Sequence, residues 1–504
     1  MPLVFFALLL GIVTYLVIRR FTAMTNTPVW MLWLVMMTPV LVLTMWVLIK
    51  GEEPPPDVLT YGLLILCPLL YAVMVLVGAT QQQKDDAKAA IAAQKTEDGK
   101  APAKPKKPPK PLTRDEETVL QRCFPWSVYY LQDIEYRPQA MICKGKLKAS
   151  ANEAYAAVQK NVQTSFGDRF LVLLREGLGD SPFFALVPNP QAKNADKVPG
   201  LSRLQAERIR QMNAPTFRPV LAFVLAIMTL FTTTLVGAVS FAGVSPEELQ
   251  ADPALFQKGL AYGLSLMAIL GVHESGHYWA TRRHKLKSTL PYFIPVPFFL
   301  GTFGAFIQMR SPMPNRRALF DVGITGPLAG LAVSLPILFW GLAQSTVVQL
   351  SEQSQLFSFE SVDPTRSALL LVASKLALGD LLVENSAIAL HPLAISGCLG
   401  LIVTALNLMP VGQLDGGHIV HAMYGQRTAA VVSQVARLLM LALSFAYRDY
   451  LLWAILLLFI PAAEPALNDV SELNGLRDFM GLLALTLLVA IILPAPPVLQ
   501  GWLF

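Results

Sequence analysis

The sequence predicts a polytopic α-helical membrane protein that carries one small α+β soluble domain. Of its 504 residues, 54% are hydrophobic and only 15% are charged, whereas soluble proteins carry roughly 25% charged residues. Several apolar runs also approach the roughly 20 residues that a helix needs to cross a hydrocarbon layer of about 30 Å. These runs are 2–18, 29–49, 58–79, 216–243, 258–281, 320–346, 391–409, 429–446 and 478–495, with a marginal one at 450–461.

The predicted parts follow one another along the chain. They are three N-terminal transmembrane spans (1–79), a basic linker (80–117), the small α+β domain (118–213), the main transmembrane core (214–425) and C-terminal spans (426–504). The amino terminus, MPLVFFALLLGIVTYLVIRR, has no basic stretch before its apolar run and no small-residue cleavage site. It is therefore predicted to stay as a span, not to be removed as a signal or transit peptide.

The net charge of +6 is unevenly distributed, and much of the lysine lies in KAPAKPKKPPKPLTR, residues 100–114. A stretch rich in Pro and Lys without apolar periodicity is typical of a solvated linker. Next to a span, such a basic run favours an anionic lipid surface over nucleic acid as its partner. A charge cluster that only sets the topology is the simpler alternative.

Residues 118–213 have the composition of a soluble α+β domain, and no catalytic motif is found in them. Strands are predicted at 141–147, 168–177 and 183–189, and an amphipathic helix at 150–166. Cys67 and Cys398 lie in apolar runs, as inert core residues do. For Cys123 and Cys143 the sequence leaves disulfide pairing open, although a cytoplasmic compartment favours free thiols.

The distribution of charged residues predicts the orientation of the spans. Basic stretches such as TRRHKLK (281–287) fall on one side of the membrane, and the acidic stretches GEEPPPD (51–57) and SPEELQADP (245–253) fall on the other. This arrangement places the α+β domain on the cytoplasmic side. It also runs the span 258–281 from outside to inside, so that its last turns lie close to the inner surface.

The stretch GVHESGHYWATRRH, residues 271–284, places two histidines and a glutamate at the end of an apolar run. In a helix His273 and His277 share a face, and Glu274 stands beside them. His-Glu-x-x-His on a helix is the pattern in which two imidazoles bind Zn²⁺ and the glutamate activates the zinc-bound water as a general base. At membrane depth an ionisable group costs about 2.5–3.5 kcal/mol and is usually partnered and functional. A polar network that joins helices is the alternative interpretation.

A zinc site with two histidines needs a third protein ligand, and the candidate is Asp415 in NLMPVGQLDGGH, residues 407–418. Pro410 ends the preceding span, and the glycines that follow allow an irregular backbone. Asp415 therefore arrives at the end of an outside-to-inside span, on the same membrane face as His273 and His277.

These two motifs, HESGH and NLMPVGQLDGG, resemble those of the site-2 protease family (M50) of intramembrane zinc metalloproteases. The resemblance covers roughly 215–425 and implies a zinc metalloendopeptidase that hydrolyses peptide bonds within or near transmembrane segments, with one catalytic Zn²⁺. It implies His273, His277 and Asp415 as zinc ligands and Glu274 as the catalytic base. It also implies that Asn407 contacts the substrate or the oxyanion.

Further stretches extend the resemblance. FLGTFGAFIQMRSP, residues 299–312, is similar to the family's re-entrant loop, which implies that Gly301, Phe303 and Gly304 contact an extended substrate. CFPWSVYYLQDIEYRPQA and PFFALVPNP resemble the plant chloroplast ethylene-dependent gravitropism-deficient and yellow-green (EGY-type) proteases and their cyanobacterial relatives. The plant proteins carry G-N-L-R where this chain reads GKLK.

The resemblance also predicts location and partners. Three leading spans and the missing transit peptide predict a bacterial protein of the cyanobacterial type, in the plasma or thylakoid membrane, with its active site near the cytoplasmic face. The expected partners are a transmembrane protein substrate and the lipid bilayer, without nucleic acid. No sequence feature assigns an oligomeric state.

Other polar residues have simpler interpretations. His284 is predicted to be a surface residue, Asp321 a helix N-cap, and His391 a residue of the opposite membrane face. His418 and His421 either support the zinc ligands or are ordinary polar positions on the helix that follows Asp415.

Two other function classes predict different patterns. A membrane transporter or metal carrier would show acidic or histidine residues at depth on several spans, and here they concentrate in one compact set. A non-catalytic chaperone derived from a protease would lack Glu274 or a ligand, and all of these residues are present.

Overall fold

The computed structural model describes most of the chain. The described residues are 28–51, 114–137, 140–177, 181–189, 218–297, 300–349, 362–383, 386–447 and 450–503, with a few single positions between 11 and 74. The predicted spans 2–18 and 58–79 and the linker up to residue 113 lie largely outside the described residues.

The chain forms two compact units. One comprises Met1–Lys107 and Val198–Arg208, and the other comprises Pro108–Lys197 and Ile209–Phe504. In the first unit, the apolar run at 29–49 forms helix α2 (Val29–Lys50). The second unit holds an α+β domain and a helical core, which contains the candidate site.

The α+β domain is an antiparallel sheet packed against two helices. Its elements are α4 (Arg114–Arg122), β1 (Tyr129–Arg137), β2 (Ala140–Leu147), α5 (Ala151–Phe166), the short 3₁₀ helix η2 (Gly167–Arg169), β3 (Phe170–Glu176) and β4 (Pro182–Pro188). The strand order is β1-β2-β4-β3, so β1 and β3 are the edge strands. Helix α5 begins after Ser150, whose hydroxyl accepts a hydrogen bond from the backbone N–H of Glu153.

Alternating apolar side chains of the sheet form the core of this domain beneath α5. Val172, Leu174 and Phe184 are almost fully buried there. The expected strands and helix are confirmed as β2, β3, β4 and α5. Strand β1 is absent from the prediction, because its sequence YYLQDIEYR mixes polar and apolar residues and a bulge between Leu131 and Asp133 interrupts its alternation.

The cysteines of the α+β domain are inert in this environment. Cys123 and Cys143 are both free and buried. Burial raises the pKa of the Cys143 thiol from an ordinary value of 9.0 to about 12. The thiolate that would react or bind a metal is therefore strongly disfavoured.

The helical core consists mostly of long apolar helices. They are α7 (Pro219–Val236), α9 (Leu260–Arg283), α10 (Arg316–Ala343), α12 (Pro392–Leu408), α13 (Asp415–Ala446) and α15 (Gly475–Ile492). Among the residues that the structure describes, 6 helices are long and apolar enough to cross a membrane; these include α2, whereas α12 is shorter. The spans predicted after residue 214 therefore correspond to helices.

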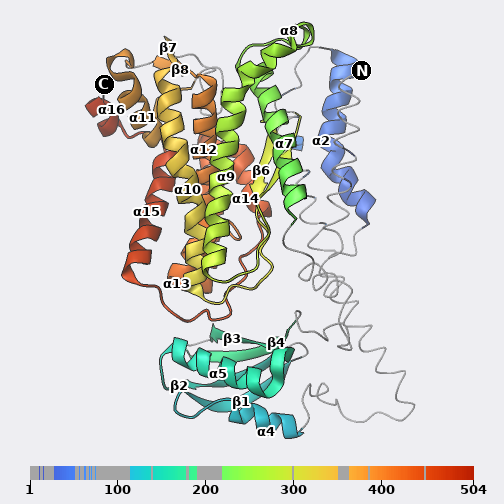
Figure 1. Ribbon diagram of the computed structural model, residues 1–504, viewed down its shortest axis with the longest axis vertical. Coiled ribbons are helices and arrows are strands. Elements are labelled where there is room, and N and C mark those ends of the chain that lie inside the picture. Colours follow the sequence, from blue (N-terminus) through green and yellow to red (C-terminus); the bar gives the residue numbers. More distant parts are fainter. Residues whose placement is uncertain are drawn as a thin grey trace. The chain divides into compact units, whose positions relative to one another are not determined.

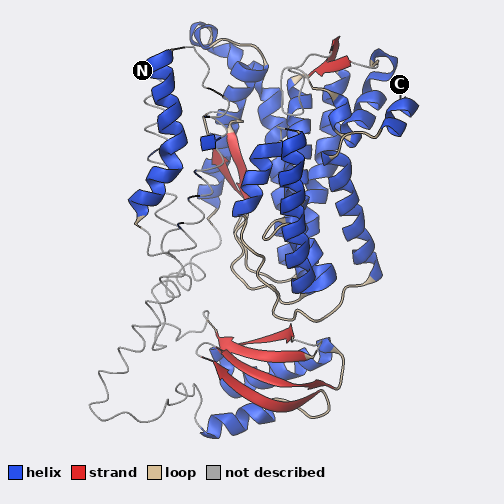
Figure 2. Cartoon of the chain, turned by 180° about the vertical axis from the view of Figure 1, so that it is seen from behind, coloured by secondary structure: helices blue, strands red, loops and turns tan. Residues whose placement is uncertain are grey.

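Shorter elements connect or flank these helices. They are η4 (Gly237–Phe241), α8 (Pro246–Ala251), η5 (Pro253–Gly259), β5 (Tyr292–Pro295), β6 (Thr302–Phe306), β7 (Thr346–Gln349), η6 (Pro364–Arg366), α11 (Ala368–Leu378), η7 (Gly379–Leu381), β8 (Ser386–Ala389), α14 (Leu451–Phe459) and α16 (Pro497–Leu503). Strands β5 and β6 form a hairpin among the helices, and β7 pairs with β8 elsewhere in the core (Figure 2).

Helices α9, α10 and α12 lie side by side, with α10 contacting both of the others (Figure 1). Glycines, which lack a Cβ atom, let the backbones of these helices approach closely. If Gly276 of α9 carried a Cβ, that atom would lie 2.6 Å from the carbonyl oxygen of Thr325 in α10. A Cβ at Gly397 of α12 would likewise lie 2.6 Å from the Cα of Leu338. Such close approach is typical of packed membrane helices, and here it fixes α10 against the helix that carries HESGH.

Helix α13 is two helices joined at a kink. Gly425 has φ 82° and ψ 168°, which is non-helical backbone that glycine adopts without strain. The first part begins at Asp415 and ends before this glycine. The second part continues to Ala446 and corresponds to the span predicted at 429–446.

Candidate metal centre

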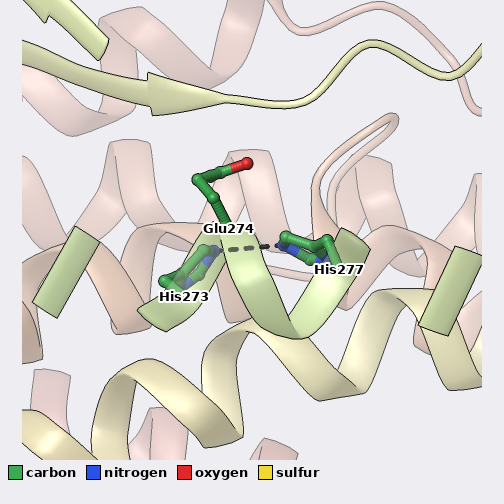
Figure 3. A group of neighbouring side chains, drawn as sticks. All are labelled: His273, Glu274 and His277. Atoms are coloured by element: carbon green, nitrogen blue, oxygen red, sulfur yellow. Dashed lines mark hydrogen bonds between the residues drawn. The ribbon is translucent and has the colours of Figure 1, made fainter. Parts of the chain in front are cut away.

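Helix α9 carries His273, Glu274 and His277 at its buried surface. Their exposed fractions are 3%, 9% and 7%. The helical repeat brings the two imidazoles together, and their Nε2 atoms lie 3.1 Å apart. Figure 3 shows the two rings facing each other across one helical turn, with the Glu274 side chain extending away from the ring pair. The structure thus places all three residues of the HExxH motif as the sequence predicts.

Asp415, the first residue of α13, reaches the same place from a distant part of the chain. Its Oδ2 lies 3.2 Å from Nε2 of His277 and 3.7 Å from Nε2 of His273. Helix α12 ends at Leu408, and the glycines on either side of Asp415 permit a tight return: a Cβ at Gly417 would lie against the carbonyl group of Gly412. Two imidazole nitrogens and one carboxylate oxygen therefore converge on one point.

The three converging atoms fit a tetrahedral zinc ion. Zn–N and Zn–O distances of about 2.0–2.1 Å imply ligand-to-ligand distances of about 3.3 Å at tetrahedral angles. The observed distances of 3.1, 3.2 and 3.7 Å straddle this value. Two histidines with one carboxylate form a donor set typical of catalytic zinc, which leaves the fourth position open.

The tautomer of His277 also suits metal binding. Its Nδ1 lies 2.8 Å from the backbone carbonyl oxygen of Val322, in α10. A carbonyl only accepts, so Nδ1–H is the donor and the lone pair of a neutral ring lies on Nε2. Nε2 is the atom that faces His273 and Asp415. A zinc-bound imidazole usually donates its other ring N–H to a carbonyl or carboxylate, as Nδ1–H of His277 donates to Val322.

Helix α10 fits closely around the ring of His277. A Cβ at Gly326 would overlap three ring atoms of His277, including Nε2. At Gly330, one turn later, a Cβ would lie 3.0 Å from Nδ1 of His273. The ring positions therefore depend on glycine in α10, which is a requirement that the sequence prediction did not include.

Glu274 is a second carboxylate within reach of the histidines. Its carboxylate oxygen and the two imidazole nitrogens all lie within 4.8 Å of one another. The backbone of Ile307, the residue after β6, lies close enough to the Glu274 carboxylate to interact with it electrostatically. The Asp415 carboxylate oxygen lies 3.7 and 3.2 Å from the two nitrogens, so it stands among the converging atoms, and Glu274 lies beside them.

Asn407, in the last turn of α12, lies at the edge of the centre. Its Nδ2 is 3.3 Å from Nε2 of His273. The amide therefore stands next to the converging atoms, where it can donate to an oxygen bound there. The structure therefore brings Asn407 next to His273. Its contact with the substrate or the oxyanion remains a prediction.

The segment predicted to be a loop at 299–312 contains the end of the β5–β6 hairpin. Gly301 and Gly304 have φ of 82° and 98°, values that favour glycine. Phe303, between them, is 62% exposed. The turn is held by two helices, because the Thr232 hydroxyl of α7 donates to the carbonyl of Gly301 (2.7 Å) and the Tyr262 hydroxyl of α9 donates to that of Leu300 (3.0 Å).

Two polar residues differ from their predicted roles. Asp321 is not an N-cap, because Asn315 caps α10 and the helix begins before Asp321. The Asp321 carboxylate instead accepts from both Nε and Nη2 of Arg477, at 2.7 and 2.9 Å. His284 is not a simple surface residue, because its Nε2 lies 2.8 Å from the same carboxylate. These contacts join α10, α15 and the end of α9.

The remaining histidines lie on different sides of the centre. His391 is the N-cap of α12, far along that helix from Asn407. His421 is buried and contacts Asp469, with Nε2 2.9 Å from Oδ1, and no sequence pattern indicates Asp469 as its partner. A Cβ at Gly323 of α10 would lie 3.2 Å from the Cβ of His418, which therefore faces α10.

Comparison with known proteins identifies relatives for most of the chain. Residues 261–447 match the model of Peptidase family M50. The chain is 27% identical over 411 residues to "Probable zinc metalloprotease EGY1, chloroplastic" of Oryza sativa subsp. japonica, covering 77% of this chain and 69% of the relative. It is 28% identical over 403 residues to the protein of the same name from Arabidopsis thaliana, covering 75% and 71%. No solved structure matches.

These relatives contradict the predicted localisation. The sequence predicts a bacterial protein of the cyanobacterial type, whereas the matched proteins come from rice and Arabidopsis and are named chloroplastic. The relatives thus point to a plant chloroplast and not to a bacterial membrane. The bacterial interpretation rests on the three leading spans and the missing transit peptide of the amino terminus, most of which lies outside the described residues.

Proposed function

We propose, for a chain that belongs to the site-2 protease family of intramembrane zinc metalloproteases (peptidase family M50), that His273, His277 and Asp415 bind its zinc ion and that Glu274 is its catalytic base. The chain is a zinc metalloendopeptidase with Zn²⁺ as cofactor. The single observation that supports the ligand set best is the convergence of Asp415 Oδ2 on both imidazole Nε2 atoms, at 3.2 and 3.7 Å.

The chemistry follows from the placement of these side chains. A zinc ion held by His273, His277 and Asp415 would polarise the scissile carbonyl and would lower the pKa of water toward about 7. Glu274 accepts the proton of the attacking water and donates it to the leaving amine. Asn407, beside His273, donates its amide N–H to the carbonyl oxygen as negative charge develops there.

The proposed substrate is a transmembrane segment of another membrane protein. Its backbone amides are hydrogen-bonded while the segment is helical, so the chain must unwind locally before it is cut. The β5–β6 hairpin supports this step, because the backbone of Ile307, next to β6, lies near the Glu274 carboxylate. A substrate strand aligned with β6 would lie at the catalytic base, with the exposed Phe303 at the turn available for contact.

The organisation of the chain is part of the proposal. Residues 214–425 would form the catalytic core within the bilayer, with 1–79 and 426–504 as flanking spans and 80–117 as a linker. The α+β domain would lie in water, since charged side chains such as Lys144 and Glu135 occupy its exposed surface. Membrane protein and lipid are the proposed partners, and nucleic acid is not.

Zinc removal tests the proposed function. The purified full-length protein in lipid vesicles is expected to cleave a single-span test peptide that carries Gly and Pro near one end of its span, because these residues ease unwinding. Chelation with 1,10-phenanthroline should reduce cleavage at least about 100-fold, and added Zn²⁺ should restore it. Product formation is followed by mass spectrometry. Cleavage that continues after zinc has been removed would contradict the proposal.

The hairpin anchor gives a second test. Replacing Thr232 by Val removes the hydroxyl that donates to the carbonyl of Gly301, which still accepts from the N–H of Val296 at 3.1 Å, so the loss of one hydrogen bond costs about 0.5–1.5 kcal/mol. The T232V variant is expected to cleave the peptide about tenfold more slowly with an unchanged zinc content. T229V is the matched control, because the Thr229 hydroxyl donates to Leu225 within its own helix. Equal rates for T232V and T229V would show that the hairpin does not position the substrate.

A further inference from the structure

A cluster of four charged and polar residues, three of them buried and one exposed, lies where the α+β domain meets the helical core. We name it the junction cluster: Glu176 from β3, Arg316 from α10, His421 from α13 and Asp469 from the segment before α15. Arg316, His421 and Asp469 are only 5%, 1% and 3% exposed. The cluster lies outside the metal centre, and the mechanism above does not use it.

Asp469 connects the other members of the junction cluster. Its Oδ1 accepts from Nε of Arg316 at 3.2 Å and lies 2.9 Å from Nε2 of His421. Nη2 of the same Arg316 donates to Oε1 of Glu176 at 2.8 Å. Buried charges are stable only when partners compensate them, so the loss of one member leaves the others unfavourably placed.

The backbone of Asp469 is held by the α+β domain. The Asp469 N–H donates to the carbonyl of Leu174 at 3.0 Å, and the Leu174 N–H donates to the carbonyl of Leu467 at 2.8 Å. Leu174 belongs to β3, an edge strand of the four-stranded sheet. Residues 467–469 therefore add a short parallel strand to this edge, as peptides do in β-augmentation.

The other side of the same segment is fixed to the helical core. The N–H groups of Leu467 and Asn468 donate to the carbonyls of Met313 and Pro314, at 2.8 and 3.0 Å. Met313 and Pro314 come just before Asn315, the N-cap of α10. The segment 467–469 is thus held between the sheet and the start of α10, so the Asp469 carboxylate has a defined position.

His421 connects Asp469 to the helix that carries Asp415. It lies in the first part of α13, the short helix that begins with Asp415 and ends at the kink of Gly425. At that kink a Cβ on Gly425 would lie 2.8 Å from Nη2 of Arg316, so the guanidinium occupies the space that glycine leaves. One end of this short helix therefore bears Asp415, and the junction cluster holds the other end.

We propose that Asp469 is a positioning residue of the metal centre: through His421 and Arg316 it orients the short helix that presents Asp415 to the histidines. The α+β domain is then a structural part of the zinc site, because its strand β3 holds Asp469. The inference rests on the proposed function only in taking Asp415 as a zinc ligand.

The test measures zinc affinity and needs no substrate. The full-length protein in detergent micelles is titrated with a competing chelator to obtain the zinc dissociation constant. The variants are H421L, H421Q, D469A and the double variant H421L/D469A. H421L removes the donor to Asp469, whereas H421Q keeps an N–H donor on a side chain of similar reach. D363A is the matched control, since Asp363 is also buried (8% exposed) and paired with arginine, Arg366.

The expected results are specific to the cluster. H421L and D469A each weaken zinc binding about tenfold, H421Q stays within about threefold of wild type, and D363A stays within about twofold. The double variant H421L/D469A binds zinc no more weakly than the weaker-binding of the two single variants, because both substitutions break the same contact between His421 and Asp469. Thermal unfolding in the same micelles identifies a variant that fails to fold. If D469A is such a variant, the comparison of H421L with H421Q decides the matter.

Three results would overturn the proposal: H421L binds zinc as wild type does, the two single effects multiply in the double variant, or D363A weakens binding as much as D469A. Failure of the proposed function shows up separately. If D415A kept wild-type zinc affinity, the ligand set would be wrong. If wild type bound zinc normally and cut no membrane peptide, the proteolytic role would be wrong and the positioning result would stand.

Discussion

Replacing Glu274 by Gln is expected to reduce kcat for peptide cleavage at least about 1,000-fold while the zinc content stays near one ion per chain. The amide has nearly the same shape as the carboxylate, yet it cannot accept the proton of the attacking water, and general base catalysis contributes about 10²–10⁴-fold. Zinc stays bound because His273, His277 and Asp415 are unchanged. The measurements are single-turnover cleavage of a labelled membrane peptide and metal analysis of the same sample.

The matched control for this variant is E247Q, because Glu247 is an exposed glutamate of α8 and has no role in the site. E247Q should cleave at the wild-type rate. An E274Q protein that retains zinc and cleaves within about tenfold of wild type would exclude Glu274 as the base. An E274Q protein that loses its zinc would instead make Glu274 a ligand, which its distance from the histidines, within 4.8 Å, would allow.

Replacing Gly326 by Ala is expected to weaken zinc binding at least about 100-fold and to abolish cleavage. The added methyl group would overlap the ring of His277, including Nε2, so the imidazole must leave its position. Helix α10 itself should not suffer, since alanine favours a helix over glycine by about 1 kcal/mol. The zinc dissociation constant and the thermal unfolding temperature, measured together, separate displacement of the ligand from loss of the fold.

The control substitution is G271A on α9, the helix that carries both histidines. A Cβ at Gly271 meets only the end of the Phe293 ring, at 3.5 Å, which is ordinary contact. G271A should therefore bind zinc and cleave like wild type. If G326A also binds zinc like wild type, α10 must be able to move away from α9, and the close fit around His277 is not a requirement for activity.

Sequence patterns predicted the centre because its geometry is set by short-range rules. His273 and His277 share a helix face by the helical repeat alone, and Asp415 follows a span whose direction places it at the same depth. The His-Glu-x-x-His pattern indicates Glu274 as the base, and the family resemblance adds Asn407 to the site. Each of these inferences needs only one helix or the order of the spans.

The parts that were not predicted depend on pairs that are distant in sequence. Asp321 resembles an N-cap from its position at the start of an apolar run, and only the fold shows that Arg477 and His284 bind it. In the same way, nothing near Asp469 in the sequence indicates that His421 and Arg316 contact it. Periodicity and motif spacing carry no information on which distant side chains meet.

The added strand at β3 has a consequence for synthesis of the protein. The chain leaves the ribosome from its amino terminus, so the sheet of the α+β domain is made long before residues 467–469 that complete its edge. During that interval β3 presents unpaired N–H and C=O groups, which can pair with another chain. Nascent molecules are therefore exposed to aggregation, or depend on a chaperone, until almost the last helix has been translated.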